Sequence, residues 1–384
     1  MSKPKIRFKG YEEDWEQRKL SKVAKYRNGK AHENSIAENG KYIVVNSKFV
    51  STDGRVRKFS NEQIEPLYKG EIAFVLSDVP NGRAIARTFL VDKDGKYTLN
   101  QRIAGITPYE NTDSYFLHIL MNRNRYFLKF DDGNKQTNLS VNDVTNFEEK
   151  YPSYEEQYKI GQCFSNLDHL ITLHQRKCEE TKKLKKYMLQ KMFPQNRKRV
   201  PEIRFAGFTD DWEQRKLGDL TTYRNGTGHE EKQSDVGKYE LVNLNSISID
   251  GGLKPSGKFI DEETETLIKD DLVMVLSDVG HGDLLGRVAI IPENNRFVLN
   301  QRVALLRNNG FADTKYLFSY INAHQRYFKL QGAGSSQLNI SRGSVENFEV
   351  LLPKRDEQKQ IGECFSNLDH LITLHQRQYQ KLFQ

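Results

Sequence analysis

The segment IGQCFSNLDHLITLHQR at residues 160–176 returns as IGECFSNLDHLITLHQR at residues 361–377, and only Gln162 and Glu363 differ. Shorter segments recur in the same order along the chain, at offsets between 197 and 201 residues. They are WEQRKL (15–20 and 212–217), YRNG (26–29 and 223–226), VLSDV (75–79 and 275–279), LNQR (99–102 and 299–302) and RYF (125–127 and 326–328). A period this long is unlike that of a solenoid. It predicts the duplication of a whole domain.

Each copy combines two kinds of pattern within a chain of 384 residues, a length that suits two or three domains. Helical spacing of apolar residues predicts one helix per copy, over 113–130 and 313–330. Trp15 and Trp212 occupy equivalent positions and are expected in the two cores, with contact to another subunit as the alternative. Short β-rich runs punctuated by Gly, Asn and Asp predict strands over 40–50, 70–79, 239–249 and 296–307. The fold class predicted is therefore α+β, with two duplicated mixed globules.

The repeated segment itself predicts a long helix in each copy. Its apolar residues alternate between spacings of four and three, which is a heptad seam that needs a partner helix. The other copy is the obvious partner, as an antiparallel coiled coil with a pseudo-twofold axis separating the two globules. The seam is predicted at Ile160, Phe164, Leu167, Ile171, Ile361, Phe365, Leu368 and Ile372. The domains predicted are a first globule (1–153), a central spacer helix (154–193), a linker (194–200), a second globule (201–353) and a C-terminal spacer helix (354–384).

Charge and composition narrow the class of partner. The formal net charge of +8 and the pI of about 9.1 favour binding to a polyanion, most commonly nucleic acid. No apolar run approaches the ~18–20 residues that span a bilayer, so no membrane association is expected. Three cysteines without a C-x-x-C pair argue against disulfides and a Cys metal site. The predicted location is cytoplasmic.

Two related globules around a twofold axis match two half-sites on one DNA duplex. The copies differ most at 30–67 against 227–267 and at 80–98 against 280–298, which suggests two readers of different sequences. Drift of loops after duplication is the alternative explanation. Loop residues with donors and acceptors suited to base edges or phosphate are the candidates for DNA contact. They are Arg27, Asn28, Asn46, Ser47, Lys48, Ser77, Asn81, Arg83, Arg102, Lys135, Gln136, Arg224, Asn225, Asn243, Asn245, Ser277, His281, Arg302, Ser335, Ser336 and Gln337.

Catalytic motifs are missing from the sequence. It has no G-x-x-x-x-G-K-[ST] loop for ATP, no zinc-protease pair of histidines and no NPPY-like tetrapeptide of adenine methyltransferases. We therefore expect a binding protein with no catalytic or metal site. An interaction scaffold and an enzyme with an unrecognised site, such as a nuclease, remain the alternatives. Salt-dependent binding to one bipartite duplex would distinguish a DNA-binding protein from an interaction scaffold. Metal-dependent cleavage by the chain alone would support an enzyme.

The paired WEQRKL segments, the LSD…LNQR core and the repeated CFSNLDHLITLHQR helix resemble the specificity subunits of type I restriction–modification systems. MLQKMFPQ at the end of the central helix is also typical of them. The resemblance covers essentially the whole chain. It implies that each globule reads one half of an asymmetric bipartite DNA sequence and that the helices set the gap.

The resemblance also implies partners. Two modification subunits would bring S-adenosylmethionine and methylate adenine in double-stranded DNA, and restriction subunits would add ATP- and Mg²⁺-dependent cleavage. None of these cofactors would bind this chain. The sequence departs from the pattern of this family in its second long helix. That helix has fewer residues after HQR than the first and is expected to be shorter.

Overall fold

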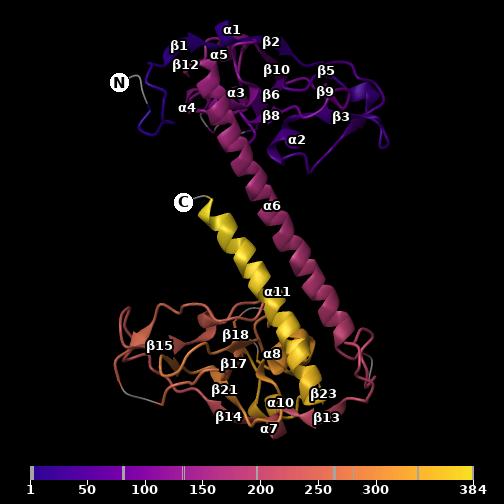
Figure 1. Cartoon of the computed structure of the whole chain (residues 1–384), viewed down its shortest axis with the longest axis vertical. Coiled ribbons are helices and arrows are strands. Elements are labelled where there is room, and N and C mark those ends of the chain that lie inside the picture. The colour runs from indigo at the N-terminus through magenta and orange to yellow at the C-terminus, as the bar shows by residue number, and fades with distance from the viewer. Residues whose placement is uncertain are drawn as a thin grey trace. The chain divides into compact units, whose positions relative to one another are not determined.

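The computed structural model describes residues 4–79, 83–131, 133, 135–195, 198–262, 265–279, 281–334 and 337–382. The chain forms two compact units, Met1–Ile171 and Thr172–Gln384, and the division falls inside the long helix α6 (Tyr154–Met192) (Figure 1). Each unit contains the globule of one copy of the repeat. The predicted α+β class and the duplication are confirmed.

The first unit contains two four-stranded sheets. One sheet is antiparallel throughout, in the order β2 (Ala24–Asn28), β10 (Ile103–Pro108), β6 (Ile72–Val75), β8 (Thr88–Leu90). The other includes one parallel pair, β3 with β9, in the order β4 (Phe59–Ser60), β3 (Tyr42–Val45), β9 (Tyr97–Leu99), β5 (Pro66–Leu67). Both β6 and β9 are buried along their whole length, and the sequence of β6 is apolar throughout, as is typical of a strand buried on both faces.

Two short antiparallel pairs complete the first unit. β1 (Glu16–Lys19) pairs with β12 (Glu148–Tyr151), and β7 (Ser77–Asp78) pairs with β11 (Thr137–Asn138). The short helical elements are α1 (Leu20–Val23), η1 (Glu33–Ser35), α2 (Ser47–Ser51), α3 (Ser114–Met121), α4 (Arg125–Leu128) and α5 (Val141–Thr145).

The second unit repeats this plan. Its larger sheet has the order β14 (Thr221–Asn225), β21 (Val303–Asn308), β17 (Leu272–Val275), β19 (Val288–Ile290), and its smaller sheet β16 (Phe259–Ile260), β15 (Tyr239–Val242), β20 (Phe297–Leu299). The short pairs are β13 (Glu213–Lys216) with β23 (Glu349–Leu352) and β18 (Ser277–Asp278) with β22 (Leu338–Asn339). The helices are α7 (Leu217–Leu220), η2 (Leu244–Ser246), α8 (Thr314–Ala323), α9 (Gln325–Gln331), α10 (Arg342–Glu346) and α11 (Arg355–Lys381).

The two tryptophans lie at equivalent places but differ in burial. Trp212 is fully buried in the core of the second unit, beside Tyr316. Trp15 is only half-buried and meets the ring of Phe116 edge-on, with 6.3 Å between ring centroids. The expected core position therefore holds fully for the second copy alone.

The single helix predicted over 113–130 is wrong, because the structure divides it into α3 and α4. Arg123 between them adopts a left-handed backbone conformation with φ of 56°. Asn124 then caps α4, since its side chain accepts from the N–H of Tyr126. The helix predicted over 313–330 is likewise divided, into α8 and α9 at His324.

The strand predicted over 40–50 is also wrong in its second half. Asn46 accepts a hydrogen bond from the N–H of Phe49 and begins helix α2 after β3. The strand predicted over 239–249 is interrupted in the same way, because Asn243 caps the short helix η2. In both copies an Asn that follows a strand starts a helix, as its capping preference allows.

The later part of α6 runs antiparallel to α11 in the second unit (Figure 1). His174 contacts His375 through their Nδ1 atoms at 3.3 Å, and Lys185 binds Asp369 at 2.5 Å. Phe193, which directly follows α6, stacks on Phe365. Because His174 and His375 are equivalent residues of the repeat, this part of the helix pair has the local symmetry of a twofold axis.

The seam residues predicted on α11 face apolar neighbours. Ile361 and Phe365 are fully buried in the core of the second unit, and Leu368 packs against it. Ile372 is half-buried. In the first copy, Ile160 packs against the core of the first unit.

The rest of the first-copy seam is less buried. Leu167 and Ile171 are half-buried, whereas Phe164 is 45 % exposed. The seam of the first copy therefore begins as a contact between helix and globule.

Candidate nucleic-acid interface

Three of the shared segments converge at one place in the first unit. The N–H of Gly29, in YRNG, donates to the carbonyl of Ile103, and the N–H of Gln101, in LNQR, donates to the carbonyl of Lys30. The N–H of Leu76, in VLSDV, donates to the carbonyl of Arg102. A Cβ on Gly29 would collide with the carbonyl oxygen of Asn100, so only glycine fits this approach.

The second unit repeats the convergence. The N–H of Gly226 donates to the carbonyl of Val303, and that of Leu276 donates to the carbonyl of Arg302. A Cβ on Gly226 would meet the Asn300 carbonyl oxygen. The segments that the two copies share thus build the same scaffold twice.

A fourth segment joins this scaffold through a serine. The amide of Gln136 donates to the Ser77 hydroxyl at 2.8 Å, and β11 pairs with β7. In the second copy the Gln337 amide donates to the Ser277 hydroxyl, which in turn donates to Asn339 at 2.7 Å. The structure therefore brings together predicted residues that lie some sixty positions apart in the sequence.

Arg102 and Arg302 are the exposed cations of this scaffold. Both adopt a left-handed backbone with φ of 66°, which is uncommon for a residue other than glycine. Neither makes an ion pair with a carboxylate in the part of the chain that the structure describes. A guanidinium in this position can bind a phosphate bidentately.

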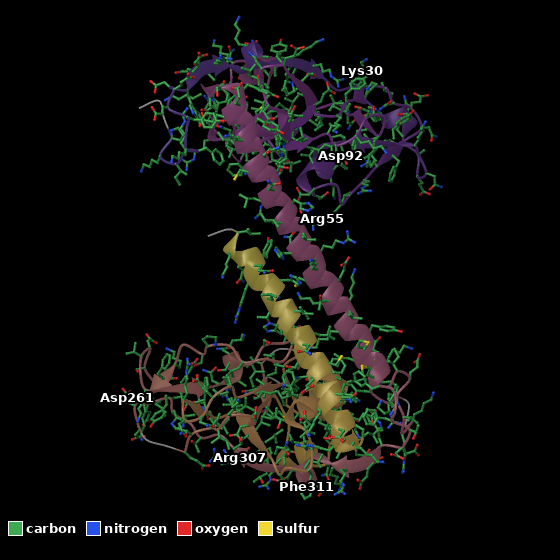
Figure 2. The ribbon with its side chains drawn as sticks, in the orientation of Figure 1. Lys30, Arg55, Asp92, Asp261, Arg307 and Phe311 are labelled. Atoms are coloured by element: carbon green, nitrogen blue, oxygen red, sulfur yellow. The ribbon has the colours of Figure 1, made fainter. Side chains whose placement is uncertain are left out.

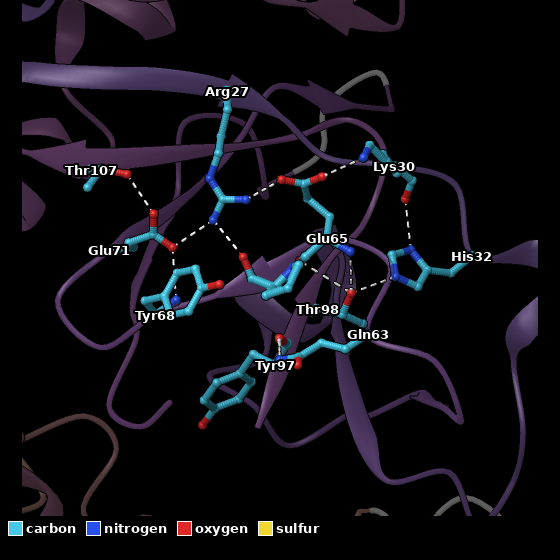
Figure 3. Close-up of polar contacts among 11 residues, drawn as sticks. Arg27, Lys30, His32, Gln63, Glu65, Tyr68, Glu71, Tyr97, Thr98 and Thr107 are labelled. Atoms are coloured by element: carbon cyan, nitrogen blue, oxygen red, sulfur yellow. Dashed lines mark hydrogen bonds and ion pairs between the residues drawn. The ribbon is translucent and has the colours of Figure 1, made fainter. Parts of the chain in front are cut away.

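Arg27, in contrast, is used inside the first unit (Figure 3). Its guanidinium forms ion pairs with Glu65 and Glu71 and donates to the carbonyl of Pro66. Burial alone would raise the pKa of Glu65, but hydrogen bonds from Lys30 and Arg27 outweigh it and lower that pKa. The contacts leave Arg27 little free donor capacity for DNA.

Arg224, the equivalent residue in the second unit, pairs with Glu265. Burial lowers the pKa of Arg224, and the neighbouring Arg307 lowers it further. Arg307 in turn binds Asp271 with both ends of its guanidinium at 2.8 Å. The same position is thus neutralised in both copies, although through different partners.

The neighbours of these arginines are also occupied. Asn28 and Asn225 accept hydrogen bonds from the hydroxyls of Tyr26 and Tyr223, each at 2.6 Å. The predicted residues Asn46 and Asn243 act as helix caps, and their side-chain oxygens are occupied by backbone N–H groups.

The remaining predicted residues are mostly at the surface. Exposed are Lys48, Arg83, Lys135, Asn245 and His281, whereas Ser47 is half-buried. Asn81, Ser335 and Ser336 lie outside the described residues. Further exposed cations of the divergent segment 30–67 are Lys30 and Arg55, both on the first unit (Figure 2).

Two arginines near this surface were missed by the sequence reasoning. Arg87 lies within the divergent segment 80–98, so the segment pointed to it although the residue was not singled out. Arg123 lay inside the stretch predicted as one continuous helix. Only the break between α3 and α4 brings it to the turn at 83–87, where its N–H donates to the carbonyl of Ala86.

No group of three or more His, Cys, Asp or Glu suited to a metal ion occurs among the residues described. Within the same residues, every helix is too short or too polar to cross a membrane. The three cysteines are unpaired thiols.

The fold and the surface define a duplicated, basic binding protein. The chain matches the type I restriction modification DNA specificity domain twice, over residues 12–183 and 209–384, and it belongs to that family. Specificity subunits of type I systems are non-catalytic members of assemblies that bind DNA.

Known relatives agree over nearly the whole chain. A putative type I restriction enzyme MjaX specificity subunit and the MjaVIII specificity subunit, both of Methanocaldococcus jannaschii, are each 22% identical. The matches cover 96% of this chain and 90% and 89% of those proteins. The crystal structure of a type I restriction–modification S subunit from M. genitalium has 15% sequence identity and a TM-score of 0.69, covering 99% of this chain and 96% of that one. It shares the fold.

Proposed function

We propose that the chain recognises a bipartite, asymmetric sequence in double-stranded DNA, with one half-site for each globule and a gap set by the paired helices. It would direct adenine methylation by two modification subunits and ATP-dependent restriction by further subunits. S-adenosylmethionine, ATP and Mg²⁺ would bind those partners, in the cytoplasm.

One observation carries this proposal. The same segments build the same scaffold in both units, whereas the neighbouring segments 30–67 and 227–267 differ in sequence between them. A common frame with different exposed side chains is what two readers of unlike sequences require. Base edges in the major groove present distinct patterns of donors and acceptors, so different side chains select different bases.

The different environments of the equivalent arginines support the same conclusion. Arg27 and Arg224 hold the scaffold together by internal ion pairs, while Arg102 and Arg302 remain exposed at equivalent places. Contacts that both globules share would position the duplex through its phosphates. Contacts that differ would read its bases.

The test is co-expression with the cognate modification subunit, followed by single-molecule sequencing for N6-methyladenine. We expect one bipartite motif with a fixed gap and a methylated adenine in each half. Cells that express the modification subunit alone are the control. A stable complex without a methylated motif would contradict the proposal, and the absence of any complex would favour an interaction scaffold.

A further inference from the structure

Three arginines gather around one turn of the first unit. Arg87 donates through Nε to the carbonyl of Arg83 at 2.7 Å, and Arg123 donates through Nη1 to the carbonyl of Ile85 at 3.3 Å. Arg83 itself is exposed. Arg83, Arg87 and Arg123, here called the arginine cluster, come from two segments that are distant in sequence.

The backbone beneath the cluster is held firmly. The Asp78 carboxylate accepts hydrogen bonds from the N–H groups of Ala84 and Ile85 at 2.5 and 3.1 Å. The N–H of Ala86 donates to Val75, and the N–H of Arg123 donates to Ala86 at 2.8 Å. The turn and the junction between α3 and α4 are therefore tied to each other and to strand β6. Little backbone entropy therefore remains to be lost when the arginines bind a ligand.

The cluster has an excess of positive charge. No member forms an ion pair with a carboxylate that the structure describes, and the nearby Asp78 is occupied by backbone N–H groups. Each guanidinium has five N–H donors, and a carbonyl takes only one from Arg87 and from Arg123. The remaining donors are available for an anion.

The second unit lacks this cluster. Asp283 stands at the position of Arg83 and pairs with Lys329 at 2.7 Å. Arg287 matches Arg87 and donates to the carbonyl of Asn322. Where Arg123 approaches the turn in the first unit, the neutral Gln325 donates to the carbonyl of Gly286. Asp250 also acts on Arg287, so the corresponding surface carries less positive charge than the arginine cluster.

We infer that the arginine cluster binds DNA phosphates beside the first half-site, as an anchor that the second globule does not have. The inference rests on the proposed function. Guanidinium groups bind phosphate bidentately, and such contacts fix the register of a protein on the duplex without reading sequence. The two half-sites then contribute unequally to binding, because the first globule supplies more of the electrostatic free energy.

The test uses the complex with the modification subunits and the triple variant Arg83→Gln, Arg87→Gln, Arg123→Gln. Equilibrium binding to the methylated-motif duplex and to an unrelated duplex is measured between about 50 and 200 mM salt. Each lost phosphate contact reduces the slope of log K against log[salt] by about 0.9. We expect a reduction of about 2 to 3, equal for both duplexes, and an unchanged methylated motif.

Two further variants make the result specific. Lys22→Gln, Lys69→Gln, Lys93→Gln removes the same charge from exposed positions of the first unit and is expected to change the slope by less than about 1. Arg83→Gln alone alters an exposed side chain, so it preserves folding, and it is expected to lower the slope by about 1.

The possible failures can be told apart. If the wild-type complex binds no bipartite duplex, both the proposed function and the inference are wrong. If it binds one but the cluster variant keeps the wild-type slope, only the inference is wrong. Loss of the modification subunits from the variant, with an unchanged slope, would identify the cluster as a docking site for acidic protein and would also overturn the inference.

Discussion

His118 in α3 has its Nδ1 shielded from solvent, with no hydrogen-bond partner among the residues described. Burial lowers the pKa of His118 from 6.5 to about 4. Between these two pH values the unfolded chain binds a proton that the folded chain does not. The free energy of unfolding therefore falls as the pH falls through this window, and the contribution of His118 is fully present above pH 6.5. At the lower end the loss reaches at most about 3 kcal/mol.

The variant His118→Gln should therefore remove part of the acid sensitivity. Urea unfolding of the full chain is measured at pH 5 and pH 7.5, where the wild type should lose about 2 kcal/mol through this residue. The exposed His370→Gln is the control, and it should behave as the wild type. Equal acid sensitivity in both variants would show that His118 is not responsible.

Single residues also mark the limit of the sequence reasoning. Arg27 and Asn46 carry side chains suited to DNA, yet Arg27 forms ion pairs with two glutamates and Asn46 caps a helix. Residue type predicted the kind of bond that each side chain makes. It could not give the partner, because Glu65 and Glu71 reach Arg27 only through the pairing of strands distant in sequence.

At the scale of elements, each long helix has a glycine near its start that packs against a shorter helix. In α11, a Cβ on Gly362 would lie 2.8 Å from Asp313 Oδ1 and 2.9 Å from the backbone nitrogen of Tyr316. Asp313 cannot move away easily, because its carboxylate caps α8 by accepting from Tyr316 N–H. Gly161 of α6 meets Asp113 in the same way.

The substitution Gly362→Ala tests this contact. Alanine favours a helix interior by about 1 kcal/mol over glycine, but the steric conflict costs more. We expect a net destabilisation of about 1–2 kcal/mol, measured by urea unfolding. Gly343→Ala in α10 is the matched control, since its Cβ would lie 3.9 Å from the nearest atom. It should stabilise by about 0.5–1 kcal/mol, and a similar gain from Gly362→Ala would contradict the packing argument.

The long helices were the elements that sequence periodicity predicted best. The heptad spacing in the repeated segment indicated both α6 and α11. Ile361 and Phe365, which were predicted as seam residues, are buried in the core of the second globule. The break at Arg123 was missed because apolar spacing continues across it. The turn depends on a left-handed residue and on a hydrogen bond to Ala86, which is distant in sequence.

At the scale of the whole molecule, the two globules have separate cores. The buried clusters of the first copy contain residues up to Tyr151, and those of the second begin at Met192. Replacing 30–150 with the matching segment of a related protein should therefore change one half of the methylated motif and leave the other half and the gap unchanged. Methylome sequencing measures the outcome, and a change in both halves would contradict independent readers.

The short strand pairs at the edges of each globule have a consequence for inheritance. In the first copy, β1 at the start of the globule pairs with β12 at its end over four residues. β13 and β23 form the same pair in the second copy. The gene segments that flank this closure encode nearly identical peptides, WEQRKL and CFSNLDHLITLHQR, in both copies. Homologous recombination at such flanks would exchange a complete globule and rejoin it to strands of matching register. One recombination event would thus give a new DNA specificity in a protein that still folds.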